Sequence, residues 1–301
     1  MERYRDFNTW IRTNYGAKLY KLALDGGFTC PNRDGKCGTR GCIFCSGGSG
    51  DFSIPVGTGP DEAFERAKAL VVGKSACERY IAYFQSFTGT YAPVPQLREL
   101  YTRTLEREDV AVLDIATRPD CLGEEVIALL KELSEVKPVW IELGLQTIYS
   151  ETAEYIRRGY PLEVYDDAVR RLKAAGLTVI THMILGLPGE TAEMMAETAG
   201  HIGRVGSDGI KLQLLHVLKG TDLAADYEAG RFRCLTMEEY ISALELCLMR
   251  LPEDVVIHRL TGDGAKRDLI APLWSADKKR VLNAIRAALE RDDIVQGRLY
   301  L

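Results

Sequence analysis

The chain has 301 residues, of which 46% are hydrophobic and 27% are charged, and its formal net charge is −5. This is the composition of a globular protein with a large core, and it excludes a surface that is basic all over and binds nucleic acid by charge alone. No apolar stretch is long enough to cross a membrane, and the N-terminus lacks the apolar centre of a signal peptide.

Four of the eight cysteines stand singly in the later part of the chain: Cys77, Cys121, Cys234 and Cys247. Isolated thiols inside expected strands and helices pack as small hydrophobic groups in a reducing compartment. We therefore expect a cytoplasmic protein that makes no membrane contact.

Strands and helices are predicted to alternate along the chain. Helical spacing of Phe7, Trp10 and Ile11 predicts a short N-terminal helix. Nearly continuous apolar runs predict six strands, at 18–25, 79–84, 110–116, 139–145, 177–185 and 209–217. Amphipathic spacing predicts helices at 61–72, 94–106, 123–136, 162–175, 190–205, 236–250 and about 275–290.

This alternation implies a parallel sheet with helices on its outside. Thr236 and Glu239 form a capping-box pattern at the start of the helix 236–250. We expect a core over residues 1–221 and a C-terminal extension over 222–301 that closes the open side, most simply as one structural unit.

The other four cysteines fall within sixteen residues of a glycine-rich loop after the first strand: Cys30, Cys37, Cys42 and Cys45. Cysteines at such short spacing bind a soft metal centre. One interpretation is a closed tetrahedral zinc site made by all four thiolates. The other is an iron–sulfur cluster held by three of them, spaced C-x11-C-x2-C, with one iron left open.

Polar or glycine-bearing segments follow all six expected strands. The carboxyl ends of parallel strands are where α/β proteins place their chemistry. These segments are the cysteine loop and residues 85–88, 117–120, 146–147, 186–190 and 216–221.

The order of these segments resembles the radical S-adenosylmethionine (SAM) superfamily. The wide cysteine spacing, together with LDGGFTCPNRDG, YFQSFTGTYAP, IATRPDCL, ELGLQT, HMILGLPGET, KLQLLHVLKGT and IHRLTGDGAKRDLIAPLW, is similar to the YhcC/YtqA branch, which is related to the catalytic subunit of elongator. The resemblance implies a partial (β/α)6 barrel that holds a [4Fe–4S] cluster and SAM. It also implies an electron donor of the flavodoxin or ferredoxin type.

The resemblance assigns the cluster to Cys30, Cys42 and Cys45. Phe44 matches an aromatic residue that shields the cluster, and Cys37 has no counterpart in the three-ligand pattern.

The resemblance assigns SAM to polar groups at other strand ends. Gln85 and Ser86 occupy the place of the segment that contacts the SAM amino group, although the family's glycine-glycine-glutamate ending is missing here. Gln146 matches a ribose ligand, and Arg158 matches a partner of the SAM carboxylate. The turn from Gly186 to Glu190 would let the backbone approach the adenine.

Four further residues are candidates for catalysis. Glu142 lies within the fourth strand and would be a functional group if it pointed into the barrel. His216 follows the sixth strand, where a histidine satisfied by its surroundings is equally expected. Arg259 and Asp263 belong to the RLTGDG turn, which we interpret as a lid over the substrate rather than a purely structural turn.

The substrate hypothesis follows from the elongator-like branch. We expect radical SAM chemistry on a modified wobble uridine of tRNA, at the 5-aminomethyl step, with phosphate contacts from basic clusters such as 157–158, 170–173 and 278–280. A small-metabolite substrate is the alternative, and a non-catalytic zinc-stapled binding protein is the alternative from a different class.

Overall fold

The computed structural model describes residues 2–47, 53–55, 59–71, 77–262, 264 and 266–300. Its centre is a mostly parallel sheet in which six strands follow one another in chain order. They are β1 (Tyr20–Asp25), β3 (Tyr80–Phe84), β4 (Val110–Thr117), β5 (Val139–Gln146), β6 (Thr178–Leu185) and β7 (Gly209–Leu214). All six strands expected from the sequence are confirmed.

Two strands that the sequence did not predict extend this sheet at its edges. The short β2 (Ile54–Pro55) pairs with β1, and β9 (Val256–Arg259) pairs in parallel with β7. The strand order is linear from β2 to β9, so the barrel is partial and open between these two edges. The N-terminal segment continues the β9 side through a parallel bridge between Asp6 and Ile257.

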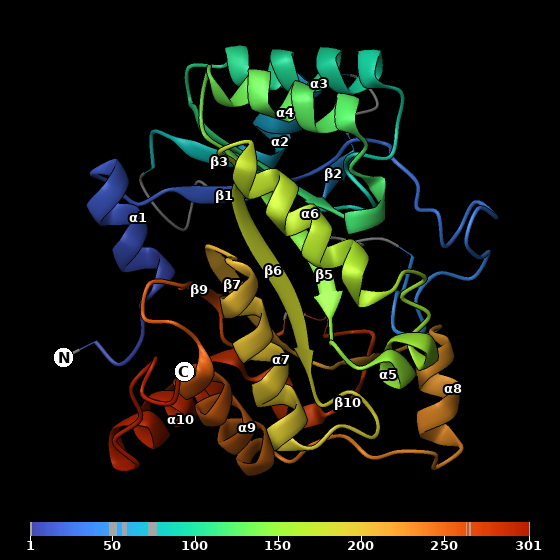
Figure 1. Cartoon of the computed structure of the whole chain (residues 1–301), viewed down its shortest axis with the longest axis vertical. Coiled ribbons are helices and arrows are strands. Elements are labelled where there is room, and N and C mark those ends of the chain that lie inside the picture. Colours follow the sequence, from blue (N-terminus) through green and yellow to red (C-terminus); the bar gives the residue numbers. More distant parts are fainter. Residues whose placement is uncertain are drawn as a thin grey trace.

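Helices cover the outside of the sheet (Figure 1). They are α1 (Phe7–Tyr15), α2 (Pro60–Ala69), α3 (Val94–Glu106), α4 (Glu124–Ser134), α5 (Ser150–Tyr155), α6 (Leu162–Ala174), α7 (Ala192–Val205), α8 (Asp222–Glu228), α9 (Met237–Arg250) and α10 (Lys278–Arg291). The capping box is present at α9, because Thr236 accepts from the Glu239 amide and the Glu239 carboxylate accepts from the Thr236 amide. No helix in the described ranges is both long and apolar enough to span a bilayer.

The segment after residue 221 contributes to the sheet as well as covering it. It supplies β9, and its helix α9 packs against α7. The expected strand 209–217 is too long: β7 ends at Leu214, and β8 (Val217–Leu218) leaves the sheet to pair antiparallel with β10 (Leu269–Ala271). The division at residue 221 stays a prediction.

The interior of the barrel has layers of different chemistry. Toward the amino ends of the strands, Trp140 is buried and its ring packs against three aromatic rings of α1, those of Phe7, Trp10 and Tyr15, with centroids 5.8–6.3 Å apart. Toward the carboxyl ends, Ile184 joins a second apolar cluster beneath the cysteine loop. Charged side chains lie between these apolar layers.

Candidate functional site

The cysteine loop begins after β1 and is folded by its own backbone. The amide of Cys37 donates to the Pro31 carbonyl at 2.8 Å, and the amide of Cys45 donates to the Cys42 carbonyl at 3.0 Å. Gly35 and Gly41 have φ values of 97° and 76°, a conformation that L side chains rarely adopt. The glycines that the sequence places here are therefore needed for the path of the loop.

Two short helices that the sequence did not predict hold this loop in place. The amide of Ile43 donates to the Ile156 carbonyl at the end of α5, and the Leu223 amide in α8 donates to the Ile43 carbonyl. Asp222 at the start of α8 pairs with both Arg40 and Arg157. The loop is thereby fixed between α5 and α8.

Asn32 is a further anchor that sequence reasoning missed. Its side chain is buried and donates from Nδ2 to the Arg157 carbonyl at 2.7 Å and toward Cys42 Sγ at 3.4 Å. Gly159 allows this approach, because a Cβ there would lie 2.7 Å from Asn32 Oδ1. The amide of Asn32 therefore joins the cysteine loop to the segment that follows β5.

Three of the four loop thiols lie in one electrostatic environment. Burial is the largest cause that raises the pKa of Cys42 to about 11, and the nearby Cys45 and Cys30 contribute in the same direction. Arg33 donates from Nη2 to Cys45 Sγ at 3.2 Å. Half-buried thiols of this kind become thiolates when a metal centre neutralises them.

Gln146 lies at the carboxyl end of β5 in a strained conformation. Its φ is 70°, and its buried Oε1 has no hydrogen-bond partner in the part of the chain that the structure describes. A buried amide oxygen without a partner costs free energy unless a ligand satisfies it. Gln146 is thus fit to bind a ligand group such as a hydroxyl.

Gln85 and Ser86 follow β3 at the same edge of the sheet. Gln85 donates from Nε2 to Ser53 Oγ at 3.0 Å, and Ser86 is buried. The assignment of these residues to the SAM amino group stays a prediction.

Arg158 is buried, and its guanidinium binds backbone carbonyls. It donates from Nε to Tyr160 at 3.0 Å and from Nη1 to Leu145 at 3.2 Å and to Thr147. Burial lowers its pKa. These bonds tie the end of β5 to the segment below the cysteine loop, and the predicted contact with the SAM carboxylate stays a prediction.

The turn after β6 is backed by protein on one side. Gly186 has a φ of 87°, and a Cβ there would lie 3.1 Å from Leu235. Glu190 accepts a hydrogen bond from Thr147, and burial raises the pKa of its carboxyl. The turn therefore lies beside the end of β5, and its predicted contact with adenine remains untested.

Glu142 points into the barrel, which the sequence had left open, and is the centre of a charged layer. Its Oε1 accepts from Lys21 Nζ at 2.7 Å, and its Oε2 lies 2.6 Å from both the Tyr83 hydroxyl and His182 Nε2. Oε2 also accepts from Lys211. Although burial opposes ionisation, the positive charges of Lys21 and Lys211 hold the pKa of Glu142 well below its usual range.

Asp114 completes this charged layer. It pairs with Lys21 through Oδ2, while its buried Oδ1 has no partner among the described residues. Burial raises the pKa of Asp114 to about 7 and lowers the pKa of Lys211 to about 7. Burial therefore opposes the charge of both groups, and the ion pairs of the layer favour it.

His216 lies against the RLTGDG turn. A Cβ on Gly262 or on Gly264 would lie 2.7 Å or 2.6 Å from the His216 ring, so these glycines are needed for the contact. Arg259 ends β9, beside Lys211 of β7 in the sheet register. Asp263 lies outside the described residues. The structure thus brings His216 to the predicted lid, and its role there stays a prediction.

Comparison with known proteins decides what this site belongs to. The model of the radical SAM superfamily matches residues 35–202, which include Cys42 and Cys45, and the model of the Radical_SAM C-terminal domain matches residues 207–291. The chain belongs to the radical SAM superfamily.

Relatives confirm the predicted branch. YtqA of Bacillus subtilis is 42% identical over 99% of this chain and 93% of its own length, and YhcC of Escherichia coli is 37% identical over 89% and 86%. A tRNA uridine(34) acetyltransferase of Methanocaldococcus jannaschii is 27% identical over 76% of this chain and 49% of its own length. The structure of Methanocaldococcus infernus Elp3 covers 92% of this chain and 64% of that one with a TM-score of 0.71 and 20% identity, which shows a shared fold.

The cofactors of this radical SAM protein are a [4Fe–4S] cluster and SAM, and the residues present fit them. Cys30, Cys42 and Cys45 offer thiols of the kind that clusters require, and Gln146 offers an unsatisfied buried oxygen. Within the described part of the chain, no three or more His, Cys, Asp or Glu side chains converge closely enough to hold a single metal ion, which applies to the three-cysteine and the four-cysteine interpretations alike. Cys37 is the exposed one of the four loop cysteines, and the other three are half-buried.

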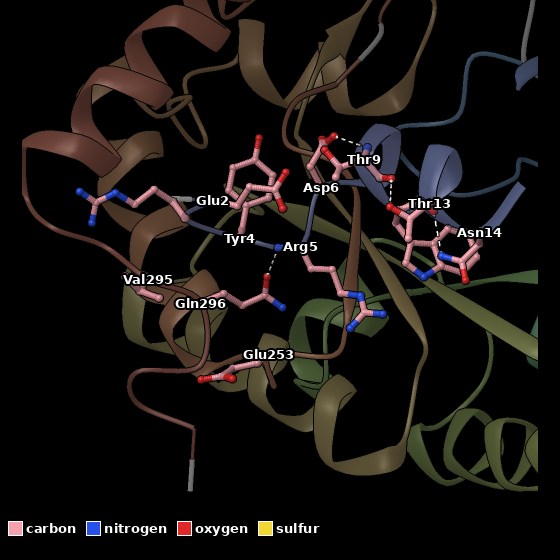
Figure 2. A pocket seen from close by; sticks show the side chains of 12 residues that line it. Glu2, Tyr4, Arg5, Asp6, Thr9, Thr13, Asn14, Glu253, Val295 and Gln296 are labelled. Atoms are coloured by element: carbon pink, nitrogen blue, oxygen red, sulfur yellow. Dashed lines mark hydrogen bonds between the residues drawn. The ribbon is translucent and has the colours of Figure 1, made fainter. Parts of the chain in front are cut away.

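Two hollows border the N-terminal segment of this radical SAM protein. Figure 2 shows the smaller one, a groove of about 460 Å³ in which Gln296 accepts from the Arg5 amide at 2.9 Å. The larger one, which we name the lateral pocket, has a volume of about 970 Å³. It is lined by the N-terminal segment with the start of α1, residues 18–21, residues 257–261 and one face of α10. Of the predicted site residues, Arg259 lines it.

Proposed function

We propose that this radical SAM enzyme modifies a wobble uridine of tRNA, at the 5-aminomethyl step. The observation that carries the proposal is the match over 76% of the chain to a protein named tRNA uridine(34) acetyltransferase, combined with the cysteine loop at the carboxyl end of a parallel barrel. The match covers about half of that relative, so the radical SAM part is the part held in common.

The chain's own residues hold the cofactors in this proposal. Cys30, Cys42 and Cys45 bind the cluster, Gln146 accepts from a ribose hydroxyl, and Arg158 keeps the end of β5 in place through backbone carbonyls. When bound, the cluster and SAM supply a carbon-centred radical that removes a hydrogen atom from a substrate. Phe44 packs on the apolar cluster beneath the loop and excludes water there.

The charged layer faces the substrate from below in this proposal. Glu142 positions Lys21, Tyr83, His182 and Lys211, each of which donates to it from a different strand. Arg259 and Asp263 act from the RLTGDG turn, and His216 acts from the end of β7 beside it. The layer supplies donors and acceptors that are already oriented, so little reorganisation is required when the substrate binds.

The test is anaerobic reconstitution followed by reduction in the presence of SAM and total tRNA from a strain that lacks the protein. We expect 5′-deoxyadenosine to form and a modified uridine nucleoside to change in mass. Cys42→Ala is the matched control and should form neither product. Deoxyadenosine without any change in tRNA would overturn the tRNA proposal and favour a small-metabolite substrate.

We also propose that the enzyme works in the cytoplasm with a flavodoxin- or ferredoxin-type electron donor. None of the eight cysteines, all of which lie in the described ranges, forms a disulfide, and an exposed thiol such as Cys37 stays reduced in such a compartment. Reduction of the reconstituted protein by a purified flavodoxin, followed optically, tests the donor.

A further inference from the structure

The lateral pocket has the size of a ligand site. Its volume of about 970 Å³ lies at the upper end of the range of small-molecule sites, and it exceeds what a single nucleotide occupies. It opens between α1 and α10, on the side where the linear sheet is not closed. Figure 1 shows both helices on the side of the molecule where the N-terminus lies. The pocket thus joins solvent to the open side of the barrel.

The lining of this pocket is positive, although the chain as a whole is negative. Three acidic side chains line it, against six basic ones. The basic residues are Arg3, Lys18, Lys21, Arg259, Lys278 and Arg286. Arg3 pairs with Asp293, and Lys21 pairs with Glu142 and Asp114, so the positive charge offered to an anionic ligand comes from other lining residues such as Lys18 and Arg286. Phosphate groups of a nucleic acid strand are such ligands.

The inner end of the pocket reaches the charged layer of the barrel. Lys21 lines the pocket, and its ammonium group bonds both Glu142 and Asp114. Its Nζ lies 5.5 Å from the centroid of the Phe7 ring, which also lines the pocket. A ligand that enters here therefore meets an aromatic ring and an ammonium group beside the charged layer.

An RNA base must leave its stack to reach such a depth. Enzymes that perform chemistry on a base extrude the nucleotide into a pocket, and aromatic side chains stack on unpaired bases. Tyr4, Phe7 and Tyr20 are the partly exposed rings of the lining, and Lys18 Nζ lies 4.7 Å from the centroid of the Tyr20 ring. Sites for single-stranded nucleic acid combine positively charged side chains, which bind the phosphates, with aromatic rings, on which bases stack. The lining of the lateral pocket has both.

We propose that the lateral pocket receives one extruded nucleotide of the RNA substrate, with its phosphates near Lys18 and Arg286 and its base directed toward Phe7 and Lys21. This inference rests on the proposed function and specifies where the substrate enters. The reacting uridine would then approach the cofactors from the open side of the sheet, between β1 and β9.

The test compares two pairs of charge reversals in the anaerobically reconstituted protein. Lys18→Glu with Arg286→Glu changes the rim of the pocket. Arg66→Glu with Lys131→Glu changes the net charge equally at exposed positions of α2 and α4. Binding of a fluorescent tRNA transcript is measured by anisotropy over a series of salt concentrations. We expect the rim pair to weaken binding by about tenfold or more and to reduce the salt slope by about two, while the control pair keeps the wild-type slope.

A cross-linking measurement locates the nucleotide directly. A transcript with thiouridine at the wobble position is irradiated on the wild-type protein, and the attached peptide is identified by mass spectrometry. We expect attachment within residues 2–21 or 257–261. Equal binding by the two charge-reversed proteins, or attachment only outside these segments, would overturn the proposed role of the lateral pocket. The proposal that tRNA is the substrate would stand. No binding of tRNA by the wild-type protein would overturn both proposals.

Discussion

Lys211 of β7 donates a hydrogen bond to Glu142 of β5, and both side chains are buried in the middle of the barrel. In the sheet, β6 lies between β5 and β7. The ion pair therefore passes over the inner face of β6, where His182 also contacts Glu142. Charged groups in such a place are stable only when each has a partner. The Lys211–Glu142 pair therefore contributes to the stability of the barrel, and it also belongs to the charged layer that we propose lies under the substrate.

Removal of the lysine should destabilise the protein strongly. Lys211→Met leaves Glu142 with less positive charge around it in a buried site, and we expect the free energy of unfolding to fall by about 3–5 kcal/mol. Urea unfolding under anaerobic conditions measures the change. Lys173→Met, which removes a lysine from a surface pair with Asp208, is the control and should cost about 1 kcal/mol or less. Equal losses in the two variants would contradict the buried pair.

Asp114 should make stability depend on pH. Burial, followed by the Glu142 carboxylate, raises the pKa of Asp114 from 3.8 to about 7. A carboxyl that holds its proton more tightly in the folded chain loses its stabilising contribution as the pH rises through this interval. Asp114→Asn stays neutral, so the wild-type protein should lose stability relative to this variant between about pH 4 and pH 7.

Unfolding in urea at a series of pH values checks this sign. Asp167→Asn serves as the control, because this partly exposed residue of α6 pairs only with Arg170 and Arg171 among the described residues, and its difference from wild type should not vary over the interval. A constant difference for Asp114→Asn as well would show that Asp114 is ionised throughout.

The cysteines of the loop should separate into two classes. We expect Cys37→Ala to retain a full complement of iron and the brown colour after reconstitution, because Cys37 is exposed and the ligands that we propose are Cys30, Cys42 and Cys45. Cys42→Ala should lose most of its iron. Iron and sulfide analysis with visible absorption measures both. Equal loss from the two variants would return the four-cysteine site to consideration.

Gln146 should contribute to SAM binding without affecting the cluster. Its buried Oε1 is available for one hydrogen bond, and loss of such a bond weakens binding by up to about tenfold. Isothermal titration of the oxidised, reconstituted Gln146→Ala protein with SAM measures the affinity, and iron analysis shows that the cluster remains. Gln96→Ala, on the exposed side of α3, is the control. Unchanged affinity would remove Gln146 from the SAM site.

The sequence predicted the features that depend on near neighbours in the chain. Six strands follow from apolar runs, the start of α9 follows from the Thr236–Glu239 spacing, and the metal-binding loop follows from clustered cysteines and glycines. Each of these signals lies within a few residues, so no knowledge of distant contacts is required.

The features that the sequence missed depend on distant partners. The strand β9 has four residues and forms only because β7 presents an edge to it, and α5 and α8 are too short for a clear periodic pattern. These last two helices are also the elements that anchor the cysteine loop.

Only the tertiary structure decided the chemistry inside the barrel. Lys21, Asp114 and Lys211 are single charged residues within apolar strands, and nothing in their local sequence indicates that they meet at Glu142. The position of Arg158 in the sequence matches that of a SAM-binding residue. In the folded chain, however, its guanidinium donates hydrogen bonds to backbone carbonyls. The register of the strands and the curvature of the sheet determine these contacts. Side chains far apart in sequence face one another only after the sheet has formed.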